Sequence, residues 1–174
     1  MMLLCQIMAQ SLILVLDNLR SFYNVGSILR TADGLGVSSV ICIGTTPYPQ
    51  INNDPRLPHV IQKANKTLSK TALGAEKTVH IQRFDIQQLI EFKDQNDYRL
   101  LCLEQANNSI NLSEATKKFS DQKILLVVGN EIDGVNPQLL KLSDAVVEIA
   151  MNGSKESFNV SVATAIAVFE FLSN

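Results

Sequence analysis

The sequence predicts an α/β fold in which a mostly parallel sheet is covered by helices on both faces. Short runs that are almost continuous in Val, Ile and Leu recur along the chain, as in strands buried on both faces. Segments with helical periodicity lie between these runs, as in successive strand–helix–strand units. The chain has 174 residues, of which 46% are hydrophobic, and it contains no internal repeat or linker. We therefore expect one domain over residues 1–174 with a substantial core.

The first half of the chain contains three predicted strands and two predicted helices. The strands are the apolar runs 12–16, 40–43 and 79–81. Helical spacing of apolar residues indicates helices at 25–35 and 60–73. A polar, Pro-rich segment at 44–58 is longer than most connections in compact domains, and this length favours a functional role.

The second half alternates in the same way. A helix at 86–92 follows Asp85, and a short helix at 112–115 follows Asn111 or includes Ser113 as its cap. Buried strands are predicted at 100–103, 124–128 and 145–149. The last predicted helix, 158–172, begins behind a Ser and an Asn, which are residue types that cap helices.

Charge and cysteine content restrict the classes of function. The net charge is −2, so no global basic field indicates nucleic-acid binding, although a local patch suffices for it. Cys5, Cys42 and Cys102 are an odd number of widely spaced cysteines, which favours reduced thiols in the cytoplasm over disulfides. His59 and His80 do not pair with a cysteine at ligand spacing, so we expect no metal site.

The N-terminus does not resemble a targeting segment. Residues 1–8 are apolar but lack a basic region and a convincing cleavage site. No segment approaches the roughly 20 apolar residues that span a bilayer. We expect a cytoplasmic protein without a membrane partner.

Residues 18–36 contain a helix whose polar and apolar residues separate onto two faces. The polar face carries Asn24, Ser27, Arg30 and Thr31. The core face carries Val25, Ile28, Leu29 and Ala32. Gly26 lacks a side chain in the first turn, which permits close approach of a substrate or of a backbone. Arg30 is suited to bidentate phosphate binding, and the alternative is a capped helix with a solvated arginine.

Two further stretches begin where buried strands end in polar, glycine-bearing turns. Residues 127–135 carry Gly129, Glu131 and Gly134, where a ligand can meet exposed backbone groups; a plain acidic turn is the alternative. In residues 150–163, Ser157 and Asn159 either cap a helix or face a small molecule at a strand-to-helix switch. The sequence has no glycine-rich dinucleotide fingerprint after a strand and no P-loop, which argues against both classes of nucleotide site.

Taken together and in this order, the three stretches closely resemble the three motifs of the SpoU (TrmH-like) RNA ribose methyltransferases. The elements between them match over nearly the whole chain. The first motif is matched by Asn24 and Arg30, and the second, G-x-E-x-x-G, by Gly129, Glu131 and Gly134. The third motif is matched by Met151, Gly153, Ser157, Asn159 and Ser161. Phe158 stands where Leu is usual, which changes the size of the side chain but not its apolar character.

This resemblance implies a fold, a cofactor and an assembly. The fold is the SPOUT α/β fold with a C-terminal trefoil knot, an exception to the rule that chains do not thread loops. The cofactor is S-adenosylmethionine, the product is a 2′-O-methylated ribose in RNA, and the enzyme is a homodimer. The implied cofactor-binding residues are Leu103, Gly129, Ile149, Met151 and Phe158.

The resemblance also implies the catalytic residues. In the family, the arginine that matches Arg30 activates the ribose hydroxyl. Because a guanidinium stays protonated in proteins, binding the neighbouring phosphate and stabilising developing negative charge is physically easier for it than acting as a base. Asn24, Ser157 and Asn159 then position Arg30 and the ribose, and Glu131 ties the knot loops together.

The surface expected to contact RNA lies within residues 54–77. Its basic residues are Arg56, Lys63, Lys66, Lys70 and Lys77, against only Asp54 and Glu76. Side chains spread in this way can follow phosphates, and a merely solvated helix face is the alternative. Because residues 70–76 are similar to family members that act on tRNA, we expect tRNA, with ribosomal RNA left open and DNA not expected.

Two other classes of protein remain as alternatives. One is a non-catalytic RNA-binding protein that keeps the fold, and the other is an unrelated α/β enzyme that uses a small nucleotide. The intact motif residues argue against the first, and the missing glycine fingerprint argues against the second.

The last helix also supports the homodimer, since it is apolar on most faces and a small domain rarely covers all of them. One apolar stripe of this helix consists of Val160, Ala163, Ala167 and Phe171. The other consists of Val162, Ile166 and Phe169.

Overall fold

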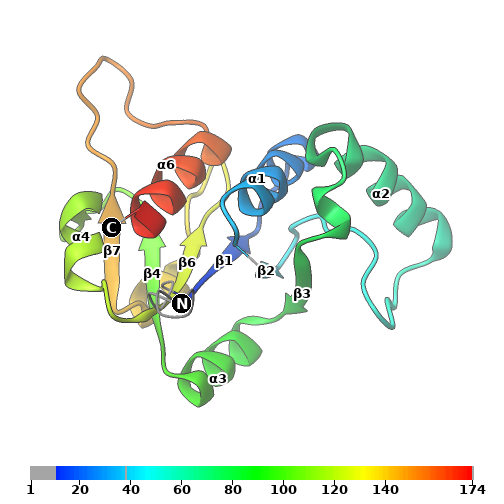
Figure 1. The fold of residues 1–174 in the computed structure, drawn as a ribbon, viewed down its shortest axis with the longest axis horizontal. Helices are drawn as coiled ribbons and strands as arrows, with labels where there is room; N and C mark the ends of the chain where they lie inside the picture. The colour runs from blue at the N-terminus through cyan, green and yellow to red at the C-terminus, as the bar shows by residue number, and fades with distance from the viewer. Residues whose placement is uncertain (1–10, 38, 174) are drawn as a thin grey trace, which may run out of the picture.

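The computed structural model describes residues 11–37 and 39–173, and its centre is a parallel sheet of seven strands. The strands are β1 (Leu12–Asp17), β2 (Ser39–Ile43), β3 (His80–Phe84), β4 (Tyr98–Leu103), β5 (Ile110–Asn111), β6 (Lys123–Val128) and β7 (Ala145–Glu148). Their order across the sheet is β3-β2-β1-β6-β4-β7-β5, and every pairing between them is parallel. This confirms the predicted fold class (Figure 1).

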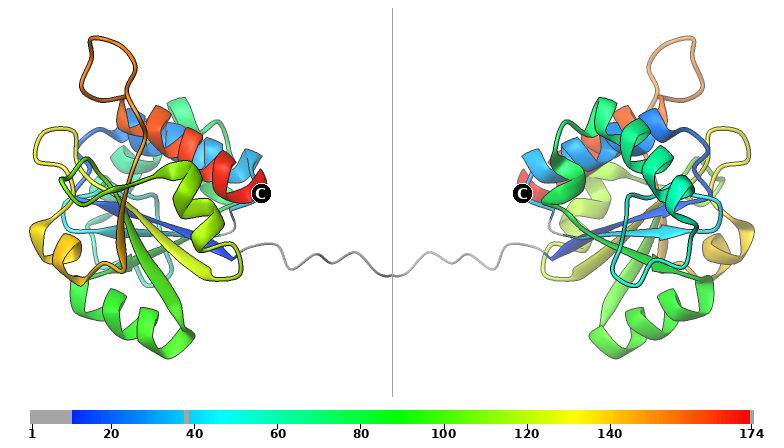
Figure 2. Two further views of the ribbon diagram at one scale, coloured as in Figure 1. Left: turned by 90° about the vertical axis from the view of Figure 1, so that its left-hand side faces the viewer. Right: turned by 90° about the vertical axis from the view of Figure 1, so that its right-hand side faces the viewer.

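Helices cover both faces of the sheet (Figures 1 and 2). One face carries α1 (Phe22–Gly34), α2 (Pro58–Ala72), α4 (Leu112–Lys118) and α6 (Val160–Ser173). The other carries α3 (Ile86–Asn96) and α5 (Pro137–Leu142). Successive side chains of a strand point to opposite faces, so Leu14 joins the first core while Ile13 and Val15 join the second. Each of these two cores therefore forms between the central strands and one layer of helices.

Most predicted elements are present, and their ends are set by caps and pairing. Helix α1 starts three residues before the predicted helix because the Ser21 hydroxyl accepts a hydrogen bond from the Asn24 N–H at 3.2 Å. Strand β3 extends to Phe84 since its partner β2 pairs along that length. Helix α6 starts at Val160 and not at residue 158, so Phe158 belongs to the preceding loop. Strand β5, helix α5 and the short 3₁₀ helix Ala75–Lys77 were not predicted.

Gly26 lets helix α1 pack closely on helix α2. A Cβ atom at Gly26 would overlap the Thr71 hydroxyl and lie 2.7 Å from the Leu68 carbonyl oxygen. The same Thr71 hydroxyl donates a hydrogen bond to the Tyr23 carbonyl at 3.1 Å. Of the two uses predicted for this glycine, the structure shows close approach of a neighbouring backbone.

The thiols of Cys42 and Cys102 are free and buried, and burial raises the pKa of each to about 12. Cys5 and the apolar N-terminal segment lie outside the described residues.

Within the described ranges, no helix has the length and apolar character needed to cross a membrane. The same ranges contain no group of three or more His, Cys, Asp or Glu side chains arranged to hold a metal ion.

Because all strands are parallel, their carboxyl ends lie at one edge of the sheet. The loops that follow β1, β4, β6 and β7 therefore gather at this edge, where open α/β sheets bind their ligands. Residues 149–159, which link β7 to α6, extend from the same edge (Figure 1).

We expect Gly26→Ala to destabilise the protein by about 1–3 kcal/mol, because the added methyl group would overlap the Thr71 hydroxyl and lie too close to the Leu68 carbonyl oxygen. Gly34→Ala in the same helix is the matched control, since its Cβ would meet nothing within 4 Å. That control should be neutral or stabilise by up to about 1 kcal/mol. Urea unfolding of both variants measures the difference, and equal stability of the two would contradict this account of the helix contact.

Candidate functional site

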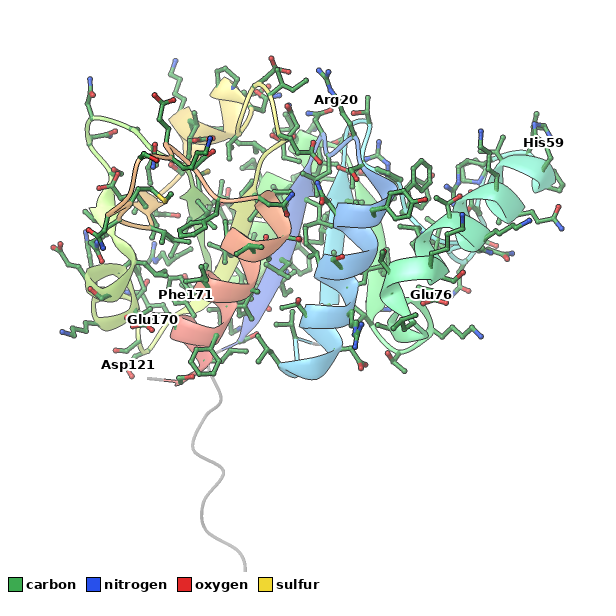
Figure 3. All side chains as sticks on the ribbon, turned by 90° about the horizontal axis from the view of Figure 1, so that it is seen from above. Arg20, His59, Glu76, Asp121, Glu170 and Phe171 are labelled. Carbon is green, nitrogen blue, oxygen red and sulfur yellow. The ribbon has the colours of Figure 1, made fainter. Side chains whose placement is uncertain are left out.

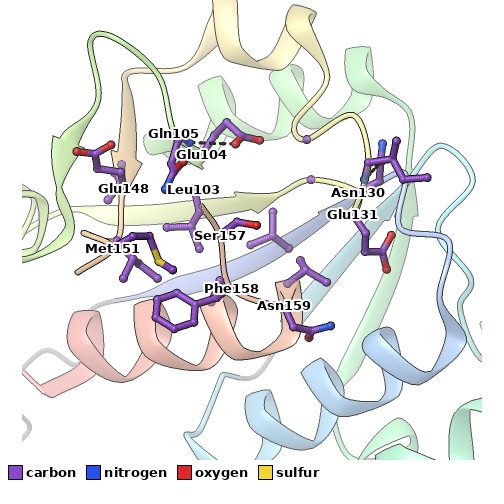
Figure 4. A pocket seen from close by; sticks show the side chains of 18 residues that line it. Leu103, Glu104, Gln105, Asn130, Glu131, Glu148, Met151, Ser157, Phe158 and Asn159 are labelled. Carbon is purple, nitrogen blue, oxygen red and sulfur yellow. Dashed lines mark hydrogen bonds between the residues drawn. The ribbon is translucent and has the colours of Figure 1, made fainter. Parts of the chain in front are cut away.

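A cavity of about 440 Å³ opens at the carboxyl ends of β4, β6 and β7, against the first turn of α6 (Figure 4). Its lining contains all five residues predicted to hold the cofactor: Leu103, Gly129, Ile149, Met151 and Phe158. It also contains three of the predicted catalytic residues: Glu131, Ser157 and Asn159. The structure thus brings residues from three distant stretches of the chain to one site.

The cavity combines apolar surfaces with carboxylates. Leu103, Val128, Val147 and Ala163 contribute aliphatic surface, and Phe158, which is 41% exposed, contributes an aromatic ring. Glu104, Glu131 and Glu148 also belong to the lining, whereas no Lys, Arg or His of residues 11–37 and 39–173 does. The site therefore favours a ligand that is partly apolar and carries positive charge or hydrogen-bond donors.

A hydrogen-bonded chain joins the three sequence motifs through Asn24. The Asn24 Nδ2 donates to Glu131 Oε1 at 2.6 Å, across 107 residues of sequence. The Asn159 Nδ2 donates to Asn24 Oδ1 at 3.3 Å, across 135 residues. Glu131 Oε2 in addition lies 3.4 Å from the backbone nitrogen of Arg20, which donates to it. The start of α1 is thus tied to the loops after β6 and β7.

The Glu131 carboxylate is held in its ionised form. Its partial burial raises the pKa, but hydrogen bonds from the Asn24 amide and from backbone N–H groups outweigh this effect. The net result is a pKa below the usual value of a glutamate. Glu131 therefore serves as a hydrogen-bond acceptor at neutral pH and not as a proton donor.

Asn159 caps the last helix and also lines the cavity. Its Oδ1 accepts a hydrogen bond from the Ser161 N–H at 2.9 Å, which caps the start of α6. Its Nδ2 donates to Asn24, and the residue lines the cavity. One side chain thus fixes the end of a helix and faces the site.

The turn after β6 is compact because two of its residues are glycines. A Cβ at Gly129 would overlap the backbone of Gly134 and Val135, and Gly134 has φ +70°. Glu104 holds the far side of this turn, since its Oε2 accepts from the Val135 N–H at 3.0 Å. Sequence reasoning missed Glu104, although a carboxylate directly after the 100–103 strand could have indicated it.

Arg30 lies farther from the cavity than the other catalytic candidates. It is exposed on α1, about 9 Å along the helix axis from Asn24, and it does not line the cavity. Within residues 11–37 and 39–173, no hydrogen bond or ion pair engages its side chain. The core face of α1 is buried as predicted, with Val25, Ile28, Leu29 and Ala32 inside.

Comparison with known proteins identifies the family. The model of the SpoU rRNA methylase family matches residues 11–169. The chain belongs to this family. It is 30% identical to the tRNA (guanosine(18)-2′-O)-methyltransferase of Aquifex aeolicus, over 92% of this chain and 68% of that protein.

Two further relatives agree with this assignment. The 23S rRNA (guanosine-2′-O-)-methyltransferase RlmB of Vibrio vulnificus is 29% identical over 93% of this chain and 59% of its own length. The solved structure of an AdoMet-bound rRNA methyltransferase from Sinorhizobium meliloti has the same fold. It gives a TM-score of 0.77 at 24% identity, over 92% of this chain and 55% of that one. The chain therefore spans only 55–68% of the length of these SpoU proteins.

The basic residues predicted to bind RNA fall into two groups in this SpoU domain. Lys63, Lys66 and Lys70 are exposed at helical spacing on α2. Arg56 is instead engaged within the 44–58 segment: its guanidinium lies 2.6 Å from the Asp54 carboxylate and 3.6 Å from the centre of the Tyr48 ring. It also donates to the Tyr48 and Pro49 carbonyls, both at 3.0 Å. Its contact with RNA stays a prediction, whereas its contacts within the segment are structural.

We expect the Asp54–Arg56 pair to give the protein a pH-dependent stability. The hydrogen bond from Arg56 lowers the pKa of Asp54 from its ordinary 3.8 to about 2. Because the folded-state pKa is depressed, the contribution of Asp54 is present above pH 3.8 and is lost as the pH falls towards 2. The free energy of unfolding of Asp54→Asn should therefore lie below that of the unmodified protein at neutral pH, with a difference that closes below about pH 4.

Urea unfolding between pH 2 and pH 7 measures this difference. Asp94→Asn is the control, since the Asp94 side chain is 67% exposed and should contribute little. A difference for Asp54→Asn that stays constant over the whole pH range would contradict the assignment.

Proposed function

We propose that this chain is an S-adenosylmethionine-dependent RNA 2′-O-ribose methyltransferase. The observation that carries the proposal is the cavity at the carboxyl edge, where residues of the second and third SpoU motifs meet and are hydrogen-bonded to Asn24 of the first. Family membership supports the same activity. The names of the relatives, one acting on tRNA and one on 23S rRNA, agree with it.

The lining of the cavity fits the proposed cofactor. S-adenosylmethionine carries an adenine ring, two ribose hydroxyls, an ammonium group and a sulfonium centre, which supplies an electrophilic methyl group. Aliphatic surface from Leu103 and Ile149 suits the ring, and the backbone groups near Gly129 offer donors and acceptors. The carboxylates in the lining suit a cationic ligand. In this proposal Leu103, Gly129, Ile149, Met151 and Phe158 hold the cofactor.

The remaining motif residues act on the RNA. Asn24, Ser157 and Asn159 orient the ribose, and Glu131 keeps the loop after β6 against α1. Arg30 binds a phosphate of the RNA and stabilises the negative charge that develops on the 2′-oxygen as this atom bonds to the methyl group, the methyl–sulfur bond breaks to leave S-adenosylhomocysteine, and the hydroxyl proton passes to water. Lys63, Lys66 and Lys70 follow the RNA backbone along α2. We propose tRNA as the substrate because a 30% identical relative modifies tRNA; ribosomal RNA is the alternative, supported by the 29% identical relative.

Nucleoside mass spectrometry tests the activity. Purified protein is incubated with S-adenosylmethionine and deproteinised tRNA or rRNA from a strain that lacks the gene. We expect one additional 2′-O-methylated nucleoside, in the tRNA fraction. Calorimetry of S-adenosylmethionine binding separates the alternatives, because a non-catalytic RNA-binding protein or an unrelated nucleotide enzyme does not require that cofactor. A folded protein without cofactor binding and without methyl transfer would refute the proposal.

We expect Arg30→Ala to abolish methyl transfer while cofactor affinity and melting temperature stay nearly unchanged. The residue is exposed and outside the cavity, so its loss removes contacts to RNA and not to the cofactor. A rate loss of about a hundredfold or more corresponds to about 2.7 kcal/mol of transition-state stabilisation. Arg30→Lys should restore little, since an ammonium group lacks the planar fork of donors. Near-normal turnover of Arg30→Ala would remove this residue from the catalytic set.

We also propose a homodimer that uses helix α6. Ala167 and Phe171 are buried within the chain, whereas Val162 and Phe169 are 46% and 58% exposed. Unpartnered apolar side chains on so apolar a helix favour a second copy as the covering surface. The C-terminal trefoil knot and the cytoplasmic location remain part of the proposal.

Sedimentation measures the oligomeric state. We expect a species of twice the 19.2 kDa chain mass, and we expect Phe169→Glu to shift it towards the monomer. Leu142→Glu is the matched control, because Leu142 is 43% exposed on α5 at the opposite face of the sheet. A monomeric unmodified protein at micromolar concentration would contradict the dimer.

A further inference from the structure

A second cavity, of about 600 Å³, lies beside the turn after β6 and is not explained by the proposed cofactor site. It shares Asn130 and Gly134 with the cofactor cavity, so the two are neighbours on either side of this turn. Residues from the loop after β1, including Asn18 and Arg20, form its other wall. The second cavity is therefore placed to hold a part of the substrate next to the reacting group.

Arg20 is the one basic side chain that lines either cavity in the described part of the chain. Its backbone nitrogen lies 3.4 Å from Glu131 Oε2, so the residue directly borders the hydrogen-bonded chain of the three motifs. Figure 3 shows Arg20 at the carboxyl edge of the sheet, with its side chain directed outward. The other ionisable groups among the described residues that line the two cavities are carboxylates, namely Asp17, Glu104, Glu131, Asp133 and Glu148.

In the free protein the Arg20 guanidinium is paired with Asp133. The Nη2 of Arg20 lies 3.0 Å from Asp133 Oδ2, and the two side chains are 59% and 65% exposed. An exposed ion pair of this kind contributes little to stability and exchanges readily with other charged partners. The guanidinium is thus available to an anion that reaches the second cavity.

The anion that the proposed reaction brings to this place is a phosphodiester. A ribose whose 2′-hydroxyl faces the cofactor cavity carries a phosphate on each side, and an edge lined with carboxylates repels both. A guanidinium can bind a phosphate through two parallel N–H···O bonds, which also fixes its orientation. Among the described residues that line the two cavities, Arg20 is the group that can do so.

We propose that Arg20 binds an RNA phosphate next to the reacting ribose, and that Asp133 competes with this phosphate for the guanidinium. The inference rests on the proposed function, since it presumes an RNA substrate. Arg20 is a binding residue in addition to Arg30, which lies on the exposed face of α1. Asp133 then weakens RNA binding in the unmodified protein and holds Arg20 in place when RNA is absent.

RNA binding at several salt concentrations tests this inference, with fluorescently labelled unfractionated tRNA and, in parallel, deproteinised rRNA as probes. Arg20→Ala should weaken RNA binding at least fivefold. It should also reduce the magnitude of the slope of log association constant against log salt concentration by about one, because one phosphate contact is lost. Arg20→Lys should bind with intermediate affinity because it keeps the charge without the fork. The dissociation constant for S-adenosylmethionine, measured by calorimetry, should change less than twofold in each variant.

Asp133→Asn tests the competition. This variant should bind RNA severalfold more tightly than the unmodified protein. The gain in affinity should disappear in the double variant with Arg20→Ala, because Asp133 affects RNA binding only through its ion pair with Arg20. A gain that persists without Arg20 would reflect a general change of charge and would overturn the role of Asp133. Arg99→Ala is the matched control, since Arg99 also lies near an aspartate, at 3.7 Å from Asp144, but at the amino end of β4.

The outcomes distinguish this inference from the proposed function. If the unmodified protein methylates RNA, and Arg20→Ala matches it in affinity and salt slope, the role of Arg20 is wrong while the function stands. If the unmodified protein binds neither RNA nor S-adenosylmethionine, the proposed function fails and the inference fails with it. An equal loss of affinity in Arg20→Ala and Arg99→Ala would also overturn the inference, because it would indicate nonspecific attraction.

Discussion

The geometry of the site depends on the two hydrogen bonds of the Asn24 carboxamide. Its nitrogen donates to Glu131 at 2.6 Å and its oxygen accepts from Asn159 at 3.3 Å, so one side chain satisfies partners from two loops. An aspartate of the same shape could not donate to Glu131 and would place two carboxylates side by side. A leucine would remove both of these hydrogen bonds. The amide therefore couples the position of α1 to the two loops that line the cavity.

Charge is divided between the cavity and the surfaces around it. Among the described residues, the lining of the cofactor cavity contains carboxylates and no basic side chain, whereas exposed lysines lie on α2 and Arg20 lines the neighbouring cavity. A cationic cofactor and a polyanionic substrate have opposite requirements, and this division meets both within one small domain. It also explains why a net charge of −2 does not argue against an RNA substrate.

Residue type predicted a structural feature correctly where the feature depends only on residues that are adjacent in sequence, as a helix cap does. The Asp85 side chain accepts from the Gln88 N–H at 2.8 Å and caps α3, as its residue type predicted. Strand β5 and helix α5 were missed because two and six residues are too few to display a hydrophobic period. Pro137, directly after Asn136, was the available signal for α5, since Asn caps helices and Pro is favoured in the first helical position.

The sequence by itself determined the fold class and the residue types of the three motifs, because strand and helix periods, caps and glycines are properties of adjacent residues. Only the tertiary structure decided which of these residues meet. The contact between Asn24 and Glu131 spans 107 residues, and nothing in the local pattern of either residue specifies it. The same holds for Arg56: the spacing of basic residues suggested a group free to bind RNA, whereas the fold of the 44–58 segment pairs it with Asp54 and Tyr48. Whether a charged side chain is free depends on which groups surround it, and that is set by packing between distant parts of the chain.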